Sequence, residues 1–303
     1  MAAKIVVVGS FNADLTSYMV RMPRPGETVV GQKFVIGPGG KGSNQAVAAA
    51  RLGAEVTFVG RVGQDVFASY ALNCWKKEGI NTDFVVQDSE QVTGVAPIFV
   101  DESGENSIVV VLGANLFVSR EDVDVAAEVI AEADILLTQL EINYEATGYA
   151  LQIAGEKGVP TILNPAPAGQ LPEEMIALAD IITPNETELE ILAGMAGATL
   201  EETAASLLRN DRQRIIITLG AQGARLVNRA GSTLIPAYKV EAVDTTGAGD
   251  AFNGGLAVGL AEGMSQEEAI AFANATAALC VTRPGTAPSM PFRREVEALL
   301  AAA

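Results

Sequence analysis

Short runs of apolar residues that end in small or polar residues recur along this chain. The runs are KIVVVGS at residues 4–10 and, further on, VTFVG, DILLTQ, VPTILN, DIITPN and RIIITLG. Runs without alternating polar residues are typical of strands buried on both faces of a parallel sheet. A helical pattern follows each run, and from Asp250 onward the chain is largely helical. The sequence therefore predicts an α/β fold with a doubly wound, mostly parallel sheet flanked by helices.

Two segments depart from this rhythm and predict a smaller, inserted sheet. Residues 27–37 and 93–113 resemble antiparallel strands, the second with a hairpin turn at residues 102–105. We therefore expect a lid sheet, with strands at about residues 14–37 and 93–113, inserted into a single domain that spans residues 1–303. VAPIFV and SIVVVL are apolar on both alternating faces, which indicates that a second subunit covers one face.

Shorter patterns predict where two helices begin. SNQAVAAARLGA predicts an alanine-rich helix that is capped by Ser43 or Asn44 and ended by Gly53. Residues 238–243 predict a strand that leads through a turn of small residues into a helix starting near Asp250. Both helix starts therefore follow glycine-rich segments.

The charge and composition of the chain exclude several classes of function. Its 303 residues include 20 Lys and Arg against 37 Asp and Glu, a formal net charge of −17. We therefore expect neither a nucleic acid nor an anionic membrane as a partner. The chain has no histidine, which excludes a Ser-His-Asp triad, a Cys-His pair and a histidine-bound zinc. Proton transfer is left to carboxylates, Lys, Tyr or Cys.

Cysteine usage and hydropathy bear on where the protein resides. Cys74 and Cys280 are far apart and lack metal-type spacing, so they are expected to be free, buried thiols in a reducing compartment. No apolar run reaches the roughly 18 residues of a membrane span, and no signal-peptide pattern is present. The expected location is the cytoplasm.

GPGGKG, at residues 37–42, has two interpretations. It matches the dinucleotide fingerprint G-x-G-x-x-G between a strand and a helix. However, it lies in the second strand–helix unit, and Arg61 stands where a ribose-binding acid would follow the next strand. It is not a Walker A loop, because Lys41 is followed by Gly42. The alternative is a tight glycine loop that leads into a helix.

VDTTGAGDAFNGG, at residues 243–255, carries the most informative pattern. The backbone N–H groups of Gly247, Ala248 and Gly249, with the helix dipole, form a nest that attracts an anion without any lysine. We expect the same dipoles to hold Asp250 ionised, so that it accepts a proton from a hydroxyl beside the anion, as in phosphoryl transfer. The alternative is an ordinary N-cap aspartate.

Two further polar pairs lie near predicted strand ends. Asn12 and Asp14 follow the first strand, where open α/β sheets bind ligands, and together suit the vicinal hydroxyls of a polyol. They also fit ordinary turn chemistry. Asn185 and Glu188 are candidates for ordering the water shell of Mg²⁺, although N-x-x-E before an apolar run is also a capping box.

In this order, SFNAD, GPGGKGSNQA, NPAPA, PNETE, TLGAQG and VDTTGAGDAF resemble the ribokinase-like (PfkB) carbohydrate kinases, from Lys4 to about Pro291. The resemblance implies a doubly wound α/β domain with a lid and, as in relatives that dimerise, a homodimer through the lid sheet. It implies ATP-dependent phosphorylation of the 5-hydroxyl of D-ribose. Deoxyribose, fructose and adenosine stay open as acceptors, although related deoxyribose kinases tend to carry an apolar residue where this chain has Asn12. Rival readings are a nucleotide-linked oxidoreductase and a non-catalytic sugar sensor.

The resemblance also assigns roles to individual residues. Asp250 is implied as the base that activates the sugar hydroxyl, with Gly247, Ala248 and Gly249 as the anion hole and Gly39 shaping the glycine loop. The implied sugar contacts are Asn12, Asp14, Gly40, Lys41, Asn44, Glu141 and Asp250. The implied nucleotide contacts are Asn185, Thr218, Gly220, Gly223, Gly249 and Asn274. Glu188 is implied for Mg²⁺ through water. The implied positions for an activating K⁺ are Asp244, Thr246, Cys280, Arg283, Gly285 and Ser289.

Overall fold

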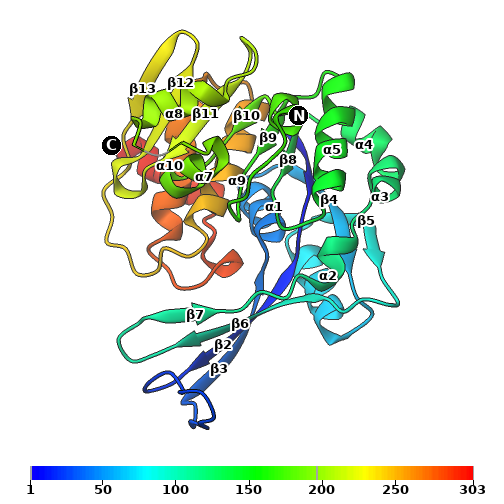
Figure 1. Ribbon diagram of the computed structural model, residues 1–303, viewed down its shortest axis with the longest axis vertical. Helices are drawn as coiled ribbons and strands as arrows, with labels where there is room; N and C mark the ends of the chain where they lie inside the picture. Colours follow the sequence, from blue (N-terminus) through cyan, green and yellow to red (C-terminus); the bar gives the residue numbers. More distant parts are fainter. Residues whose placement is uncertain (1, 196, 303) are drawn as a thin grey trace.

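A nine-stranded sheet runs through the part of the chain that the computed structural model describes, residues 2–195 and 197–302 (Figure 1). In spatial order its strands are β13 (Gly231–Ile235), β12 (Ala224–Asn228), β11 (Arg214–Thr218), β10 (Ile181–Ile182), β9 (Thr161–Leu163), β8 (Ile135–Thr138), β1 (Lys4–Val8), β4 (Glu55–Val62) and β5 (Asn81–Gln87). The strands from β11 to β5 are parallel, while β12 and β13 add an antiparallel edge. The predicted mostly parallel sheet is confirmed.

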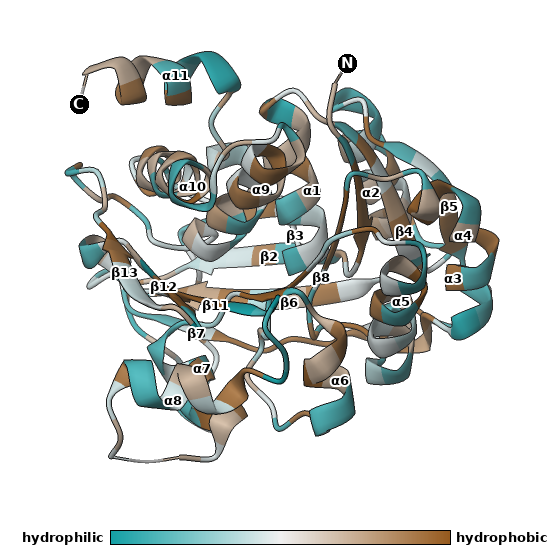
Figure 2. Ribbon diagram, turned by 90° about the horizontal axis from the view of Figure 1, so that it is seen from above, coloured by the Kyte–Doolittle hydropathy of each residue, from teal (hydrophilic) through white to brown (hydrophobic). Residues whose placement is uncertain are grey.

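Helices cover both faces of this sheet (Figure 2). One face carries α1 (Lys41–Arg51), α2 (Val66–Lys77), α9 (Ala248–Ala261), α10 (Gln266–Cys280) and α11 (Arg293–Ala302). The other carries α3 (Arg120–Val125), α4 (Ala127–Ala131), α5 (Tyr144–Glu156), α6 (Glu173–Leu178), α7 (Glu186–Ala193) and α8 (Leu200–Leu207). Within β1, Val7 packs into the first core and Val6 and Val8 into the second, because successive side chains point to opposite faces. This is why the strand has no polar alternation.

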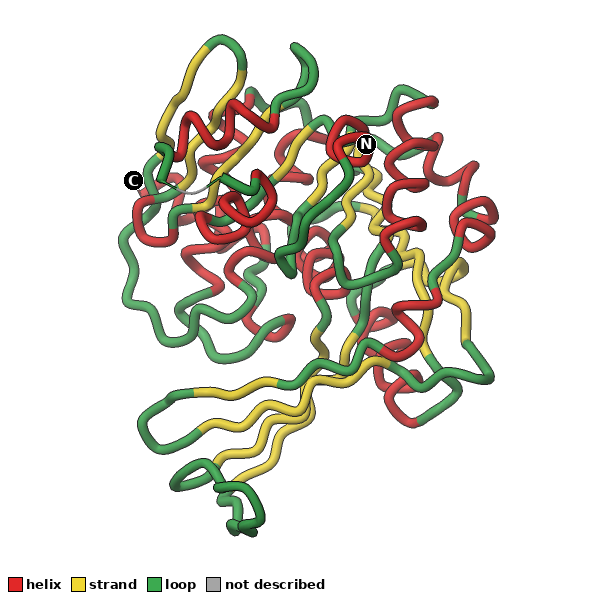
Figure 3. Tube along the Cα trace, in the orientation of Figure 1, coloured by secondary structure: helices red, strands yellow, loops and turns green. Residues whose placement is uncertain are grey.

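A second, four-stranded sheet projects from the main body (Figure 3). Its spatial order is β3 (Lys33–Gly39), β2 (Asn12–Tyr18), β6 (Gly94–Val100) and β7 (Asn106–Ile108). The hairpin between β6 and β7 is as predicted, but β2 and β6 pair in parallel. Residues 12–18 form a strand rather than a turn, and β3 begins at Lys33 rather than near residue 27, after a loop containing the PRPG turn.

Two other expectations about the sheet are wrong. β11 is followed not by a helix but by the 3₁₀ turn η2 (Gly220–Gln222) and the antiparallel strand β12, because Gly223, at φ 105°, turns the chain back. Residues 238–243 are a loop and not a strand. Instead of pairing with a neighbouring strand, the backbone N–H groups of Val243 and Asp244 donate to the Val281 carbonyl at the end of α10.

Helix α1 begins three or four residues earlier than the capping pattern predicts. Its N-cap is Gly40, and Ser43 and Asn44 lie inside the helix, buried. Ser43 Oγ accepts a hydrogen bond of 2.9 Å from the Trp75 indole, which packs between Phe11 and Phe58. Side chains expected to cap the helix are thus used in the core, while Gly53, at φ 99°, does follow the helix end as predicted.

Candidate active site

Asp250 lies in the first turn of α9, with its carboxylate held by two amides of α1. Asn44 Nδ2 donates to one oxygen at 2.9 Å, and Gln45 Nε2 donates to the other at 3.0 Å. The helix N-cap is Gly247, whose φ of 80° favours glycine, so the interpretation of Asp250 as an N-cap is wrong. The carboxylate is therefore fixed next to the backbone of residues 247–249 without capping it.

The environment of Asp250 makes it a stronger base than an ordinary aspartate. Burial raises the pKa of the Asp250 carboxyl; Lys41, Asn44 and Gln45 oppose this shift, and Glu141 adds to it. This shift runs opposite to the one that the helix dipole was expected to give, because desolvation outweighs the favourable partners. A raised pKa suits a group that must take a proton from an alcohol.

Two of the predicted sugar-binding residues, Asn12 and Lys41, donate hydrogen bonds to Glu141, which follows β8. Its Oε2 accepts hydrogen bonds from Ser10 Oγ at 2.5 Å, from the Lys41 backbone N–H at 2.9 Å and from Asn12 Nδ2 at 3.4 Å. Burial lowers the pKa of the Lys41 ammonium, but the carboxylates of Asp250, Glu141 and Glu188 outweigh it and raise that pKa. Lys41 is therefore a charged group among three acids, at the point where lid, sheet and α1 meet.

Asp14, on β2, is a half-buried carboxyl at the same place. Burial raises its pKa to about 7; a hydrogen bond from Thr286 opposes the shift, and the charges of Glu141 and Asp250 add to it. The raised pKa therefore brings the ionisation of Asp14 close to neutral pH.

The glycine loop owes its composition to how closely β3 approaches β2. A Cβ on Gly39 would overlap the Asp14 carboxylate, and one on Gly40 would lie 2.6 Å from the Asn12 nitrogen. Gly40 also has a φ of 86°. These contacts explain GPGGKG as a loop between lid and helix, so the motif does not need a dinucleotide to account for it.

Two buried amides that position the site were not identified from the sequence. Gln45 holds Asp250, as described above. Asn115, after the lid hairpin, donates from Nδ2 to Asn12 Oδ1 at 3.0 Å and accepts from the Phe11 N–H at 3.0 Å. Asn115 thus fixes the Asn12 amide with its N–H groups toward Glu141. The only sequence signal is a polar residue within an apolar stretch.

Three of the predicted nucleotide-binding residues, Asn185, Thr218 and Gly220, lie at the carboxyl ends of β10 and β11. Asn185 and Thr218 pair as an isolated parallel bridge, and η2 starts at Gly220. Gly223 packs too tightly against the Ile235 carbonyl for a side chain. Asn274 Nδ2 donates to the carbonyls of Ile235 and Pro236, at 3.0 and 3.1 Å, and so anchors the loop after β13.

Asn185 and Glu188 form the capping box that the sequence left as an alternative. Asn185 Oδ1 accepts from the Glu188 N–H at 2.8 Å, and Glu188 Oε2 accepts from the Asn185 N–H at 2.9 Å. Burial raises the pKa of Glu188, while Lys41 lowers it. Among the described residues no group of three acidic or sulfur side chains could hold a metal ion, so a metal here would rely on few protein ligands.

The residues assigned to a monovalent cation lie on two loops that are bonded together. Asp244 accepts from the Thr246 and Gly285 N–H groups, both at 2.9 Å. Cys280 Sγ and Ser289 Oγ are 3.0 Å apart. The Arg283 guanidinium pairs with Glu295, so only its backbone is left to face these loops. A cation between them would therefore be bound mainly by backbone carbonyl oxygens.

Both cysteines are free thiols, Cys280 buried and Cys74 partly so. Within residues 2–195 and 197–302, no helix has the length and apolar character needed to cross a bilayer.

Comparison with known proteins extends these observations over nearly the whole chain. A family model described as pfkB family carbohydrate kinase matches residues 2–293. The ribokinase of Haemophilus influenzae is 44% identical over 298 residues, which cover 97% of each chain. The deoxyribokinase of Salmonella typhi is 42% identical over 291 residues, which cover 95% of each chain. The structure of Arabidopsis thaliana ribokinase complexed with ribose and ATP matches with a TM-score of 0.90 and 35% identity, covering 99% of each chain.

The lid sheet, the glycine loop and the turn before Asp250 all lie inside the matched region. The chain therefore belongs to the pfkB family of carbohydrate kinases.

Proposed function

We propose that this protein transfers the γ-phosphoryl group of ATP to the 5-hydroxyl of D-ribose, giving ribose 5-phosphate and ADP. The observation that carries the proposal is Asp250, which is buried, held by Asn44 and Gln45, and set beside the backbone turn at residues 247–249. The ribokinases among its relatives support the same reaction.

Each group in the site has a task in this reaction. Asp250 accepts the proton of the sugar hydroxyl, and its raised pKa favours that transfer. The N–H groups of Gly247, Ala248 and Gly249 stabilise the charge of the migrating phosphoryl group. Lys41 adds a positive charge near Asp250, Glu141 and Glu188. Such chemistry depends on positioning and electrostatics rather than on a covalent intermediate.

Asn12 is the residue that favours ribose over deoxyribose. Asn115 occupies the carbonyl oxygen of the Asn12 amide and Glu141 accepts from its Nδ2, so the second N–H of Nδ2 would be offered to the sugar. An unmet donor in a buried site costs binding energy, which penalises a sugar without the matching hydroxyl. Because overall identity is 44% with a ribokinase and 42% with a deoxyribokinase, this contact matters more than overall similarity.

We propose two ions as helpers. Mg²⁺ would neutralise ATP phosphate charge and would be held through water by Glu188, one of whose oxygens is free of the capping box. K⁺ would be held by the loops of residues 244–246 and 280–289, a proposal supported by the hydrogen bonds that join the two loops. The free thiols and the use of ATP fit a cytoplasmic location.

We also propose that the lid sheet forms a homodimer. Phe34 and the segment of residues 108–111 expose large apolar side chains on the lid, which is the type of surface that subunit contacts bury. Covering the open edge of β7 would also remove unpaired backbone groups.

A panel of pentoses and hexoses with Mg-ATP, run with and without K⁺ and with the wild type and Asp250→Asn, tests the reaction. We expect D-ribose to lead, K⁺ to activate, and Asp250→Asn to lower kcat by orders of magnitude while calorimetry shows sugar binding largely retained. Unchanged turnover in Asp250→Asn would refute the base assignment. A different leading sugar would overturn the specificity alone.

A further inference from the structure

Thr286, in the loop between α10 and α11, has a side chain that none of the roles above uses. Its Oγ1 lies 2.8 Å from the Pro38 carbonyl on β3 and 3.1 Å from Asp14 Oδ2 on β2. One hydroxyl on the helical body thus contacts two neighbouring lid strands, β2 and β3. One of the two contacts is the proposed sugar-binding carboxylate itself.

The backbone of Thr286 faces the phosphoryl side of the site. A Cβ placed on Gly247 would lie 3.3 Å from the Thr286 Cα, so this loop packs directly on the turn that begins α9. Ser289 Oγ donates to the Thr286 carbonyl at 2.7 Å, and Asp244 binds the N–H of the preceding Gly285 at 2.9 Å. Thr286 is therefore held by the loops proposed for K⁺ while its hydroxyl reaches the sugar carboxylate.

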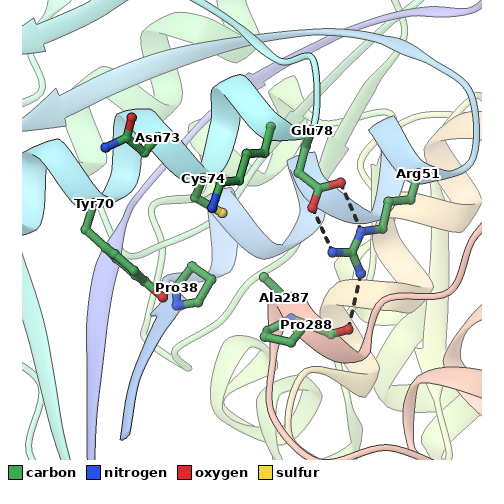
Figure 4. A pocket seen from close by; sticks show the side chains of 9 residues that line it. Pro38, Arg51, Tyr70, Asn73, Cys74, Glu78, Ala287 and Pro288 are labelled. Carbon is green, nitrogen blue, oxygen red and sulfur yellow. Dashed lines mark hydrogen bonds and ion pairs between the residues drawn. The ribbon is translucent and has the colours of Figure 1, made fainter.

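The packing on the other side of this loop is incomplete (Figure 4). A cavity of about 420 Å³ lies there, lined among others by Pro38, Tyr70 and Pro288. Arg51, paired with Glu78, donates to the carbonyls of Pro288 and Met290 and anchors the far part of the loop to α1. The cavity lies between the loop and α2, and on the lid side the Thr286 hydroxyl hydrogen-bonds the loop to β3.

We propose that Thr286 is a positioning residue that orients the Asp14 carboxylate for the sugar and couples the lid to the anion turn. This inference rests on the proposed function. A threonine hydroxyl carries a single proton, and the Pro38 carbonyl can only accept. When Asp14 ionises to receive the sugar, it competes with Pro38 for that proton. The hydroxyl can thus link the state of the carboxylate to the position of β3.

Thr286→Val tests this, because valine keeps the shape of threonine and removes the hydroxyl. Loss of a hydrogen bond to a charged group predicts a rise of about tenfold or more in KM for the sugar, with kcat and KM for ATP within about threefold. Thr286→Ser restores the hydroxyl and should return KM to within about twofold of the wild type. The matched control is Thr282→Val, whose hydroxyl in the same loop donates only to the Leu279 carbonyl.

A pH profile separates positioning from general loosening of the loop. The bond from Thr286 lowers the pKa of Asp14, so Thr286→Val should move the midpoint of the sugar KM profile to higher pH. Unchanged sugar KM and midpoint in Thr286→Val, or equal defects in the valine and serine variants, would overturn the proposal. Thr286→Ala gives the same comparison if the valine variant fails to fold. The sugar used in these assays is the one that the wild type phosphorylates best in the panel. A preference for a sugar other than ribose would therefore overturn the ribose assignment without affecting this test.

Discussion

Asp14 gives the protein a pH response that its lack of histidine would otherwise remove. Its carboxyl is half-buried on β2, faced by Glu141 and Asp250 and by the Thr286 hydroxyl, and its pKa is raised from 3.8 to about 7. Between these two pH values the carboxyl is protonated in the folded state and ionised in the unfolded state, so folding takes up a proton. Stability is therefore greatest below this window and falls as pH rises through it.

We predict that Asp14→Asn removes much of this decline. The free energy of unfolding of the wild type should fall between about pH 4 and pH 7, and that of Asp14→Asn should fall less, because the amide has no proton to lose. Urea unfolding at four pH values measures this, with Asp83→Asn at an exposed position of β5 as the control. The same slope in all three proteins would show that Asp14 is not the titrating group.

At the scale of elements, two glycines in helices show why α1 and α9 can share the Asp250 carboxylate. On α9, a Cβ at Gly254 would lie 2.6 Å from the Ala48 Cβ and 2.9 Å from the Gln45 carbonyl oxygen. The two helices therefore meet nearly backbone to backbone. Without this approach Asn44 and Gln45 could not reach Asp250.

We predict opposite effects for alanine at two helical glycines. Gly254→Ala should destabilise the protein by about 1–3 kcal/mol through overpacking and lower kcat by separating α1 from α9. Gly155→Ala in α5, where a Cβ meets nothing within 4 Å, should stabilise by about 0.5–1 kcal/mol because glycine is a poor helix former. Denaturant unfolding and steady-state rates check both, and a neutral Gly254→Ala would contradict the packing argument.

The elements that the sequence predicts well are those decided by local burial. Strand β1 was identifiable because both of its faces are covered, and the hairpin of β6 and β7 because of its turn residues. Residues 238–243 misled because their strand-like pattern belongs to a loop bonded to Val281. In the site, the family motifs indicated Asp250 and Glu141. Gln45 and Asn115 act through contacts between distant segments, which no local pattern encodes.

At the scale of the whole molecule, the lid sheet exposes several large apolar side chains to solvent. Phe34 is 58% exposed, and Val109 is 57% exposed, both on strands or loops of the lid sheet. If these side chains meet a second copy, each subunit steadies the lid of the other. The lid sheet would then both form the dimer interface and close over the sugar site.

We predict that Val109→Glu disrupts the dimer, because a buried unpaired carboxylate is costly. Sedimentation should give twice the chain mass for the wild type and the single-chain mass for Val109→Glu. Val125→Glu, at a position that is 72% exposed on α3, is the control and should leave the mass unchanged. A wild type that sediments as a single chain would refute the lid interface.

Trp75 is the only tryptophan of the chain. It is fully buried, and its indole donates to Ser43, two residues after Lys41 in the first turn of α1. The intrinsic fluorescence of the protein consequently comes chiefly from one fixed point beneath the glycine loop. Because this indole is bonded to the helix turn that follows the loop, we expect its emission to change when a sugar occupies that loop, which gives a label-free optical readout.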